Sequence, residues 1–303
     1  MSQMAQQAEL LTATPLPPSR GKLGPGRLLR ILLSNGQLLA GCLIVLTITA
    51  FALAAPWISS FQPQTANPDA VLQAPNGTHY LGTDINGMDV FARLIYAPRV
   101  DLSIALLSTG LAILIGTPIG VIAGYYSNIW SEAAMRIADL LQSFPVFVLG
   151  MALVVLTGQK IQNLVIAIAI VNAPVYARLV RTQAVYVKQR LFIEAARAAG
   201  LPDRKIVFRH LLPNSLGPIF AMSSVTIGTA MLLTAGLSFI GAGVRVPTPE
   251  WGSMIAVGTS SLMEGGAWWP SVFPGLVLSL TVLGFGMIGD SLAAVTDPRR
   301  RND

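Results

Sequence analysis

Charge, cysteine and nucleotide-binding motifs are scarce in this sequence, and each shortage excludes a class of protein. Only 11% of the 303 residues are charged, whereas a soluble domain carries about 25%. The single cysteine, Cys42, cannot form a disulfide within the chain and has no neighbours for a metal cluster. The chain contains no G-x-x-x-x-G-K-[ST] run, so it has no P-loop with which to bind ATP. Soluble domains, disulfide scaffolds and P-loop ATPases are therefore excluded.

Apolar residues are abundant instead, at 53% of the chain, and they gather in long runs. A bilayer core about 30 Å thick requires about 20 apolar residues per helix. We therefore predict an all-α, polytopic integral membrane protein with six transmembrane helices. We expect Pro145 to lie inside the third helix and Pro174 to bend the fourth. The predicted spans are residues 38–58, 102–124, 136–157, 161–180, 218–240 and 272–292.

The positions of the basic residues predict how the chain crosses the membrane. With an inner N-terminus, sixteen Lys and Arg residues fall on the inner side and four on the outer side. Basic residues concentrate on the cytoplasmic side, so we predict an N-in, C-in arrangement. The net charge of +6 thus indicates topology and not binding to nucleic acid. His79 and His210 fall on opposite sides of this arrangement, so they share no metal and no proton relay.

Residues 1–30 are rich in Pro, Gly and Gln, and we predict that they form a flexible cytoplasmic tail. A signal peptide is disfavoured because the first apolar run begins only near Leu38. Two outer segments, 59–99 and 241–271, are long enough to have structure of their own. The first ends in a predicted amphipathic helix at about 89–96. The second carries Trp251, Trp268 and Trp269, which we expect at the membrane interface.

The central charged interval reads EAARAAGLPDRKIVFRHLLPN from Glu194 to Asn214. It resembles the EAA loop of bacterial ABC-importer permeases, E-A-A-x3-G-x9-I-x-L-P. His210 stands at the position of Ile, and H-x-L-P-N is similar to the peptide-importer branch of those permeases. The matching positions are Glu194, Ala195, Ala196, Gly200, Leu212 and Pro213.

Further motifs resemble dipeptide and oligopeptide importer permeases, and among them the subunit conventionally called C. H-Y-L-G-T-D-I-N-G-M-D at 79–89 is similar to H-P-L-G-T-D-x-x-G-R-D. L-S-F-I-G at 237–241 and P-T-P-E-W-G at 247–252 are similar to L-S-F-L-G and P-T-P-E-W-G, and the final G-D-S-L and D-P-R also agree. The chain departs from the family pattern at Met88, Thr234 and Ala293.

This resemblance implies a type I ABC-importer permease fold over residues 31–303, placed as a multi-pass protein in the cell inner membrane. It implies that the chain is not an enzyme and binds no cofactor, because ATP and Mg are held by separate cytoplasmic ABC ATPase subunits. The other implied partners are a homologous B-type permease subunit and an extracytoplasmic substrate-binding protein. The implied cargo is dipeptides or oligopeptides, with nickel, haem or another small ligand as the alternative.

Two other classes of membrane protein compete with this interpretation. A secondary transporter requires ionisable residues at the membrane midplane or an inverted repeat, and we see neither in the sequence. A membrane enzyme requires a polar catalytic cluster at one depth, which is also missing.

The physical chemistry of the EAA loop, residues 181–216, predicts a short helix, a turn and a second basic helix. Glu194 favours the positive end of the first helix, and Gly200 suits the left-handed residue that ends it. Pro202 prevents that helix from continuing, and Asp203 is expected to cap the next one. The predicted ATPase-coupling surface consists of Glu194, Ala195, Ala196, Ala199, Gly200, Leu201, Asp203 and Arg204.

Two groups of residues within the spans have alternative interpretations. Asp139 and Asp290 are predicted near the inner ends, as interfacial anchors or else as a gate or an ion pair with Arg136 or a partner chain. A glycine recurs at every fourth position in the second span, which predicts a close helix contact within the chain or with the sister permease. Lining of a pathway is the alternative use. These glycines are Gly116, Gly120 and Gly124.

Overall fold

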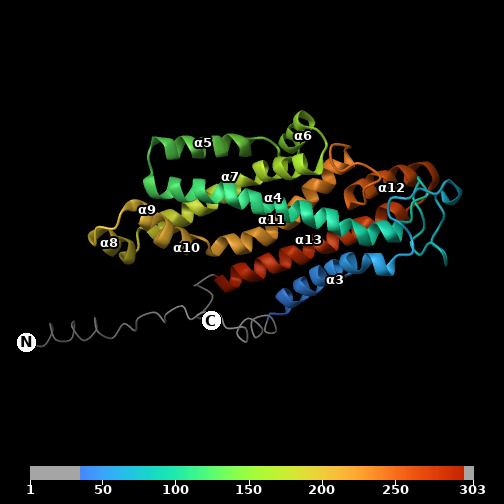
Figure 1. Cartoon of the computed structure of the whole chain (residues 1–303), viewed down its shortest axis with the longest axis horizontal. Helices are drawn as coiled ribbons and strands as arrows, with labels where there is room; N and C mark the ends of the chain where they lie inside the picture. Colours follow the sequence, from blue (N-terminus) through green and yellow to red (C-terminus); the bar gives the residue numbers. More distant parts are fainter. Residues whose placement is uncertain (1–34, 297–303) are drawn as a thin grey trace, which may run out of the picture. The chain divides into compact units, whose positions relative to one another are not determined.

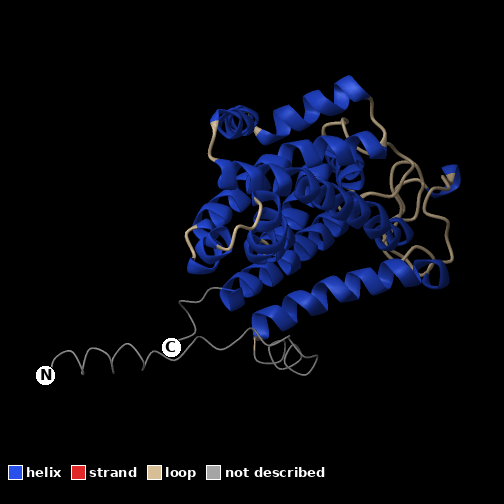
Figure 2. Ribbon diagram, turned by 60° about the vertical axis from the view of Figure 1, so that its left-hand side comes forward, coloured by secondary structure: helices blue, strands red, loops and turns tan. Residues whose placement is uncertain are grey.

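The computed structural model describes residues 35–296, and the described residues form helices joined by loops, with no strand (Figures 1 and 2). The predicted tail at 1–30 lies outside these residues. Five of the described helices are long and apolar enough to cross a membrane, and a sixth crossing exists if one bent helix pair is counted as a span. The five are α3 (Gly36–Ile58), α4 (Val90–Tyr126), α7 (Ile161–Lys188), α11 (Gly217–Phe239) and α13 (Trp269–Thr296).

The third predicted span is not one continuous helix. The structure divides it into α5 (Ile129–Ser143) and α6 (Val146–Thr157), which meet at an angle of 97°. Phe144, directly before Pro145, has an extended backbone with φ −81° and ψ 141°. Proline disfavours the helical conformation of the residue before it, and this restriction explains why the helix ends there.

Two other helices are longer than predicted. The helix expected at 89–96 is the first part of α4, so it is continuous with the second span. The Asp89 carboxylate caps α4, because its Oδ1 accepts a hydrogen bond from the Ala92 N–H at 2.6 Å. At the other end, α7 runs through Pro174 to Lys188, so residues 181–188 of the EAA loop belong to the last turns of α7.

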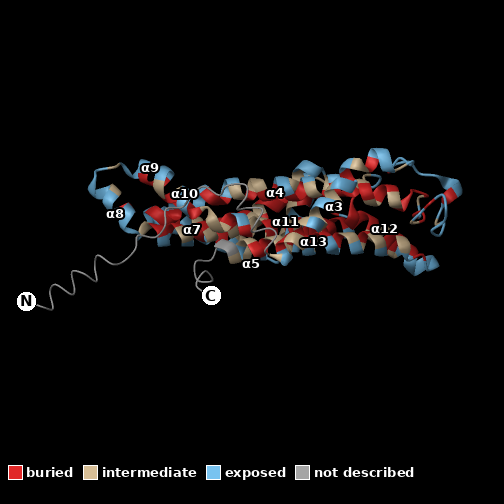
Figure 3. Ribbon diagram, turned by 90° about the horizontal axis from the view of Figure 1, so that it is seen from below, coloured by how far each residue is buried: buried red, intermediate tan, exposed pale blue. Residues whose placement is uncertain are grey.

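The short helices gather at the two ends of the long ones (Figure 1). At one end the EAA loop forms α8 (Leu191–Ala198), α9 (Asp203–Ile206), the π-helical turn η2 (Val207–Leu211) and α10 (Leu212–Ser215). At the other end lie the loops of residues 59–89, with the short η1 (Pro68–Ala70), and α12 (Trp251–Gly265). Figure 3 shows exposed residues at both of these ends and buried residues between them.

A tight seam between α4 and α7 forms much of the contact between the long helices. A Cβ atom added to Gly116 or Gly120 would lie 2.4 Å from the carbonyl oxygen of Ala173 or Ala177, respectively. One added to Gly124 would lie 2.6 Å from the Ala184 Cβ. Only glycine lets the two backbones approach this closely. The prediction of a close helix contact is confirmed, and the partner is within this chain.

Candidate functional site

The first helix of the EAA loop, α8, ends in a Schellman turn. The Gly200 N–H donates to the Arg197 carbonyl at 2.9 Å, and the Leu201 N–H donates to the Ala196 carbonyl at 3.1 Å. Gly200 has φ +74°, in the left-handed region that favours glycine. The predicted conformation of Gly200 is therefore confirmed. A Cβ atom added at this position would meet no other atom of the described part of the chain within 4 Å, so the turn points into open space.

Apolar side chains bind the EAA loop to the transmembrane helices. Ile193 of α8, Ile206 of α9 and Leu211 of η2 are fully buried, in one cluster with Tyr176 and Val180 of α7. The sequence pattern alone did not reveal these three residues, because the charged residues around them dominate the interval. A sequence signal for these residues was nevertheless present, because Ile and Leu are among the residue types most often fully buried. The shared core packs α8 and α9 against α7.

Tyr125, near the C-terminal end of α4, is the polar centre of this attachment. Its hydroxyl donates to Asp203 Oδ1 at 2.6 Å, and its carbonyl accepts a hydrogen bond from Lys188 Nζ at 2.5 Å. The Arg197 guanidinium lies over its ring, 5.3 Å from the centroid. Asp203 therefore does not cap α9 as predicted, because its carboxylate is turned toward α4 and Pro202 occupies the cap position without a side-chain bond.

The remaining predicted coupling residues lie on the side of the EAA loop that faces away from the long helices, and most of them are exposed. Ala196 and Leu201 are half-buried against the shared core. A depression of about 630 Å³ opens beside α9, and the Phe208 ring in it is 59% exposed. It is lined by Pro202, Arg204, Lys205, Phe208 and Arg209. The exposed members of the predicted set are Glu194, Ala195, Ala199, Gly200, Asp203 and Arg204.

At the opposite end, Arg93 joins the two outer segments. Arg93 is a charged residue of the helix predicted at about 89–96 to be amphipathic, but its side chain is buried, at 1% exposure. Its Nη1 donates to the carbonyls of Pro63 at 3.0 Å and Pro247 at 2.9 Å, and its Nε lies 3.8 Å from Asp84 Oδ2. Nη1 also lies 2.8 Å from the sulfur of Met88, the residue that departs from the family motif.

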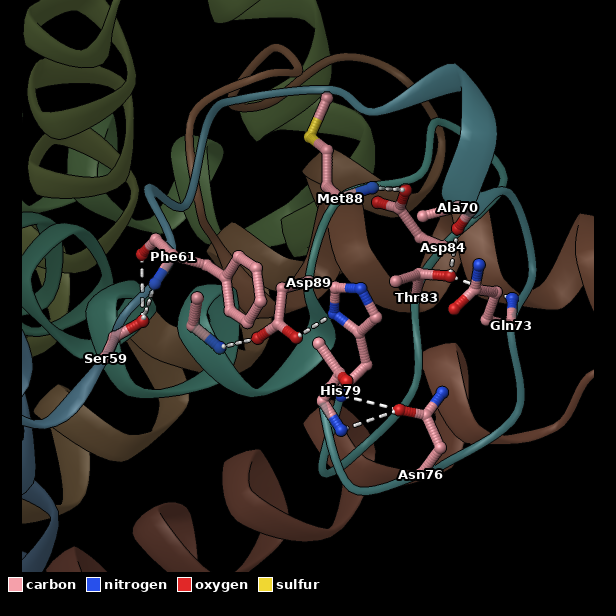
Figure 4. A network of polar contacts seen from close by, with 12 residues as sticks. Ser59, Phe61, Ala70, Gln73, Asn76, His79, Thr83, Asp84, Met88 and Asp89 are labelled. Atoms are coloured by element: carbon pink, nitrogen blue, oxygen red, sulfur yellow. Dashed lines mark hydrogen bonds and ion pairs between the residues drawn. The ribbon is translucent and has the colours of Figure 1, made fainter.

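The motif at 79–89 is a folded network and not an exposed ligand site (Figure 4). His79 Nδ1 lies 2.8 Å from Asp89 Oδ2, the carboxylate that caps α4. Asp84 Oδ1 accepts from the N–H groups of Asn86 at 2.8 Å and Met88 at 2.9 Å. Burial raises the pKa of Asp84, while the Met88 hydrogen bond, the Arg93 charge and the Asn86 hydrogen bond oppose this rise.

The motif at 247–252 has the same structural role. Glu250 caps α12, because its two carboxylate oxygens accept from the N–H groups of Gly252 at 2.8 Å and Ser253 at 2.7 Å. Trp251 is fully buried and donates from Nε1 to the Leu94 carbonyl at 3.2 Å. Trp251 therefore anchors α12 to α4, and its place at the depth of the membrane interface stays a prediction. Burial raises the pKa of Glu250, and the hydrogen bonds to Ser253 and Gly252 oppose the shift.

Comparison with known protein families shows which family the chain matches. Residues 116–302 match the family described as "Binding-protein-dependent transport system inner membrane component". The chain belongs to this family. The permease is therefore a multi-pass inner-membrane protein, as its apolar helices also indicate. Among its described residues, no group of three or more His, Cys, Asp or Glu side chains is arranged to hold a metal ion.

Several similar proteins align with the permease over most of its length. It is 38% identical over 268 residues to the dipeptide transport system permease protein of Alkalihalophilus pseudofirmus, with 88% of each chain covered. It is 36% identical to a glutathione transport system permease protein of Pectobacterium atrosepticum, with 87% of each chain covered. It is 32% identical to a probable D,D-dipeptide transport system permease protein of Escherichia coli, with 95% of this chain and 96% of the relative covered.

Solved structures show the same fold. The permease aligns with two inward-facing structures of the MetNI methionine ABC transporter at TM-scores of 0.55 and 0.52. Sequence identities are 20% and 21%, and the alignments cover 68% of this chain and 96% or 97% of the other. The predicted all-α, type I ABC-importer permease fold is confirmed.

Proposed function

We propose that the permease forms part of the translocation pathway for dipeptides and oligopeptides in an ATP-driven importer. Its relatives are named for dipeptide, D,D-dipeptide and glutathione transport. The motifs at 79–89 and 247–252 resemble the same group. The alternative cargoes, nickel and haem, are not favoured because none of these three relatives is named for the transport of nickel or haem.

The coupling of ATP hydrolysis to transport is assigned to the exposed face of the EAA loop. A separate ATPase subunit, which holds ATP and Mg, docks on the residues from Glu194 to Arg204. The observation that carries this proposal is the attachment behind that face: Ile193 and Ile206 are buried against α7, and Asp203 is bonded to Tyr125 of α4. A displacement of the loop by the ATPase subunit is therefore transmitted directly to α4 and α7, which form the most extensive contact between long helices.

The other partners occupy the remaining surfaces. An extracytoplasmic binding protein delivers the peptide to the segments 59–99 and 241–271, and a homologous B-type permease supplies the second wall of the pathway. This assignment requires the N-in, C-in orientation predicted from the basic residues, with the EAA loop in the cytoplasm.

Reconstitution tests the proposed function. The permease is placed in proteoliposomes with the sister permease, the ATPases and the binding protein, and ATP-driven uptake of labelled dialanine is measured. We expect saturable uptake, and no ATP hydrolysis by the permease alone, because the chain lacks a P-loop. ATP-driven uptake of nickel or haem without uptake of peptide would contradict the proposed cargo.

Single-cysteine labelling tests the orientation in a Cys42→Ser background. An impermeant thiol reagent applied to intact cells should label Asn76→Cys and should not label Arg204→Cys. Labelling of position 204 from outside would reverse the proposed topology.

A further inference from the structure

A stripe of polar side chains runs along α5, outside the sites described above. Glu132, Arg136, Asp139 and Ser143 follow one another at helical spacing, and all four are exposed. Charged side chains are costly when they face lipid, so a stripe of them on a helix surface favours contact with water or with another protein chain. The stripe therefore borders water or another protein chain.

Asp139 of this stripe pairs with α7. Its Oδ1 lies 2.5 Å from Arg178 Nη2, so its partner in this chain is Arg178 and not Arg136 as the sequence suggested. Both side chains remain about half exposed, at 49% for Asp139 and 53% for Arg178. A carboxylate and a guanidinium that remain this accessible keep further hydrogen-bonding capacity for a ligand.

The ion pair lies in a pocket of about 430 Å³ between α5 and α7. This volume is within the range of about 300–1,000 Å³ typical of sites for small ligands. A second guanidinium, that of Arg181, and the hydroxyl of Thr182 complete the polar lining, and the side chains of Met135 and Val185 supply the apolar part. The pocket thus presents one negative group beside two positive groups.

We propose that this pocket is a transient site for the backbone of a short zwitterionic peptide during its passage through the importer. Asp139 receives the peptide ammonium group, and Arg178 and Arg181 receive the terminal carboxylate, for which the guanidinium fork is well suited. Exposed ion pairs contribute little to stability, so the Asp139–Arg178 pair opens readily in exchange for pairs with the peptide. Every unmodified peptide carries these two charges, so the site recognises a peptide whatever its side chains.

This inference rests on the proposed function, so its test needs a readout other than transport. We place a reporter cysteine at Thr182 in the Cys42→Ser background. The complete importer is held in nanodiscs without ATP, so that reagents reach both faces, and the labelling rate of Thr182→Cys by a methanethiosulfonate reagent is measured. Dialanine should slow the labelling in a saturable manner, and N-acetyl-dialanine should protect at least about tenfold less well, because it lacks the ammonium group.

Matched variants identify the side chains that bind the two ends of the peptide. Asp139→Asn should remove the preference for dialanine over N-acetyl-dialanine, and Arg178→Gln should weaken protection by both peptides. Asp290→Asn, which removes an exposed carboxylate from α13, should leave the protection unchanged. Equal protection by the two peptides, or no protection by either, would overturn the inference, and the second result is expected if side chains of the sister permease fill the pocket.

Uptake of dialanine by the parental importer is measured in parallel. If uptake occurs but the peptides do not protect position 182, the proposed function stands and the inference about the pocket fails. If neither uptake nor protection is observed, the proposed function itself fails.

Discussion

The two ends of the permease are held in place by different interactions. At the end formed by residues 59–89 and α12, the joints are buried and polar: Arg93, Asp84 and Glu250 are almost inaccessible, and each bonds to backbone groups of a loop or helix start. At the EAA-loop end, the joint is mainly apolar, through Ile193 and Ile206, and most of the charged side chains are exposed.

This difference agrees with the roles proposed for the two ends. A buried charge is tolerated only when it is paired and hydrogen-bonded, so the network around Arg93 specifies one arrangement of the loops. The EAA loop leaves its charged groups and the Phe208 ring accessible, so they remain available to a partner. Four predictions test the comparison.

The largest effect is expected from Arg93→Met. The change leaves the carbonyls of Pro63 and Pro247 without their donor and Asp84 without its cation. Breaking a buried pair in this way typically costs about 3–5 kcal/mol. Thermal unfolding of the purified complex should show a marked loss of stability. Arg245→Met is the control, since Arg245 is exposed and bonds to Gln159 on the protein surface; equal losses for both variants would refute the assigned role of Arg93.

Gly120→Val tests whether the two ends are connected through the α4–α7 seam. The new Cβ would lie 2.4 Å from the Ala177 carbonyl, so the helices must separate. Overpacking of this kind typically costs about 1–3 kcal/mol. We expect lower thermal stability and less transport per complex. In Gly110→Val, on the same helix, the new Cβ meets nothing within 4 Å, and this variant should resemble the parent. If Gly120→Val were as stable as Gly110→Val, the seam would not be tight.

Gly200→Val separates backbone strain from docking. Valine at a left-handed position costs about 1–2 kcal/mol, and its side chain would project from the proposed coupling surface. Gly266→Val is the matched control, because Gly266 also has a left-handed backbone, with φ +72°, and open space around it, but lies at the end of α12. Both variants should insert and lose similar stability. Only Gly200→Val should weaken the association of the ATPase subunits with the permease; equal association in the two variants would contradict the proposed docking site.

The smallest effect is expected from Tyr125→Phe. The change removes one hydroxyl that donates to Asp203 and keeps the ring over which Arg197 lies. A single hydrogen bond contributes about 1 kcal/mol, so assembly should be normal. We expect more ATP hydrolysed per peptide transported, because the loop is tied less firmly to α4. Tyr126→Phe, at a ring that is 45% exposed, serves as control, and an unchanged ratio in Tyr125→Phe would exclude this hydrogen bond from coupling.

Most of the helices could be predicted from the sequence because apolar runs are sufficient to define them. The bounds of α3 and α11 agree with the predicted spans to within two residues. The break at Pro145 could have been predicted as well, since proline restricts the residue before it, but the apolar composition on both sides hid it. The left-handed turn at Gly200 was predictable because only local conformation decides it.

The partners of the charged residues could not be predicted. Arg93 meets Pro247, and Asp139 meets Arg178, across long separations in the sequence. Tyr125 reaches Asp203 in the same way. Such contacts depend on how the helices pack. A periodic pattern in the sequence indicates only which residues lie on the same face of one helix or strand.

The sequence by itself determined that this chain is an α-helical membrane protein of a known permease family, because hydrophobic length and local turn chemistry are properties of short segments. The tertiary structure alone decided which polar side chains are buried, which are joined across helices and which remain free for a partner. The reason is physical: the cost of a charge depends on its surroundings, and those surroundings exist only after distant segments have packed together.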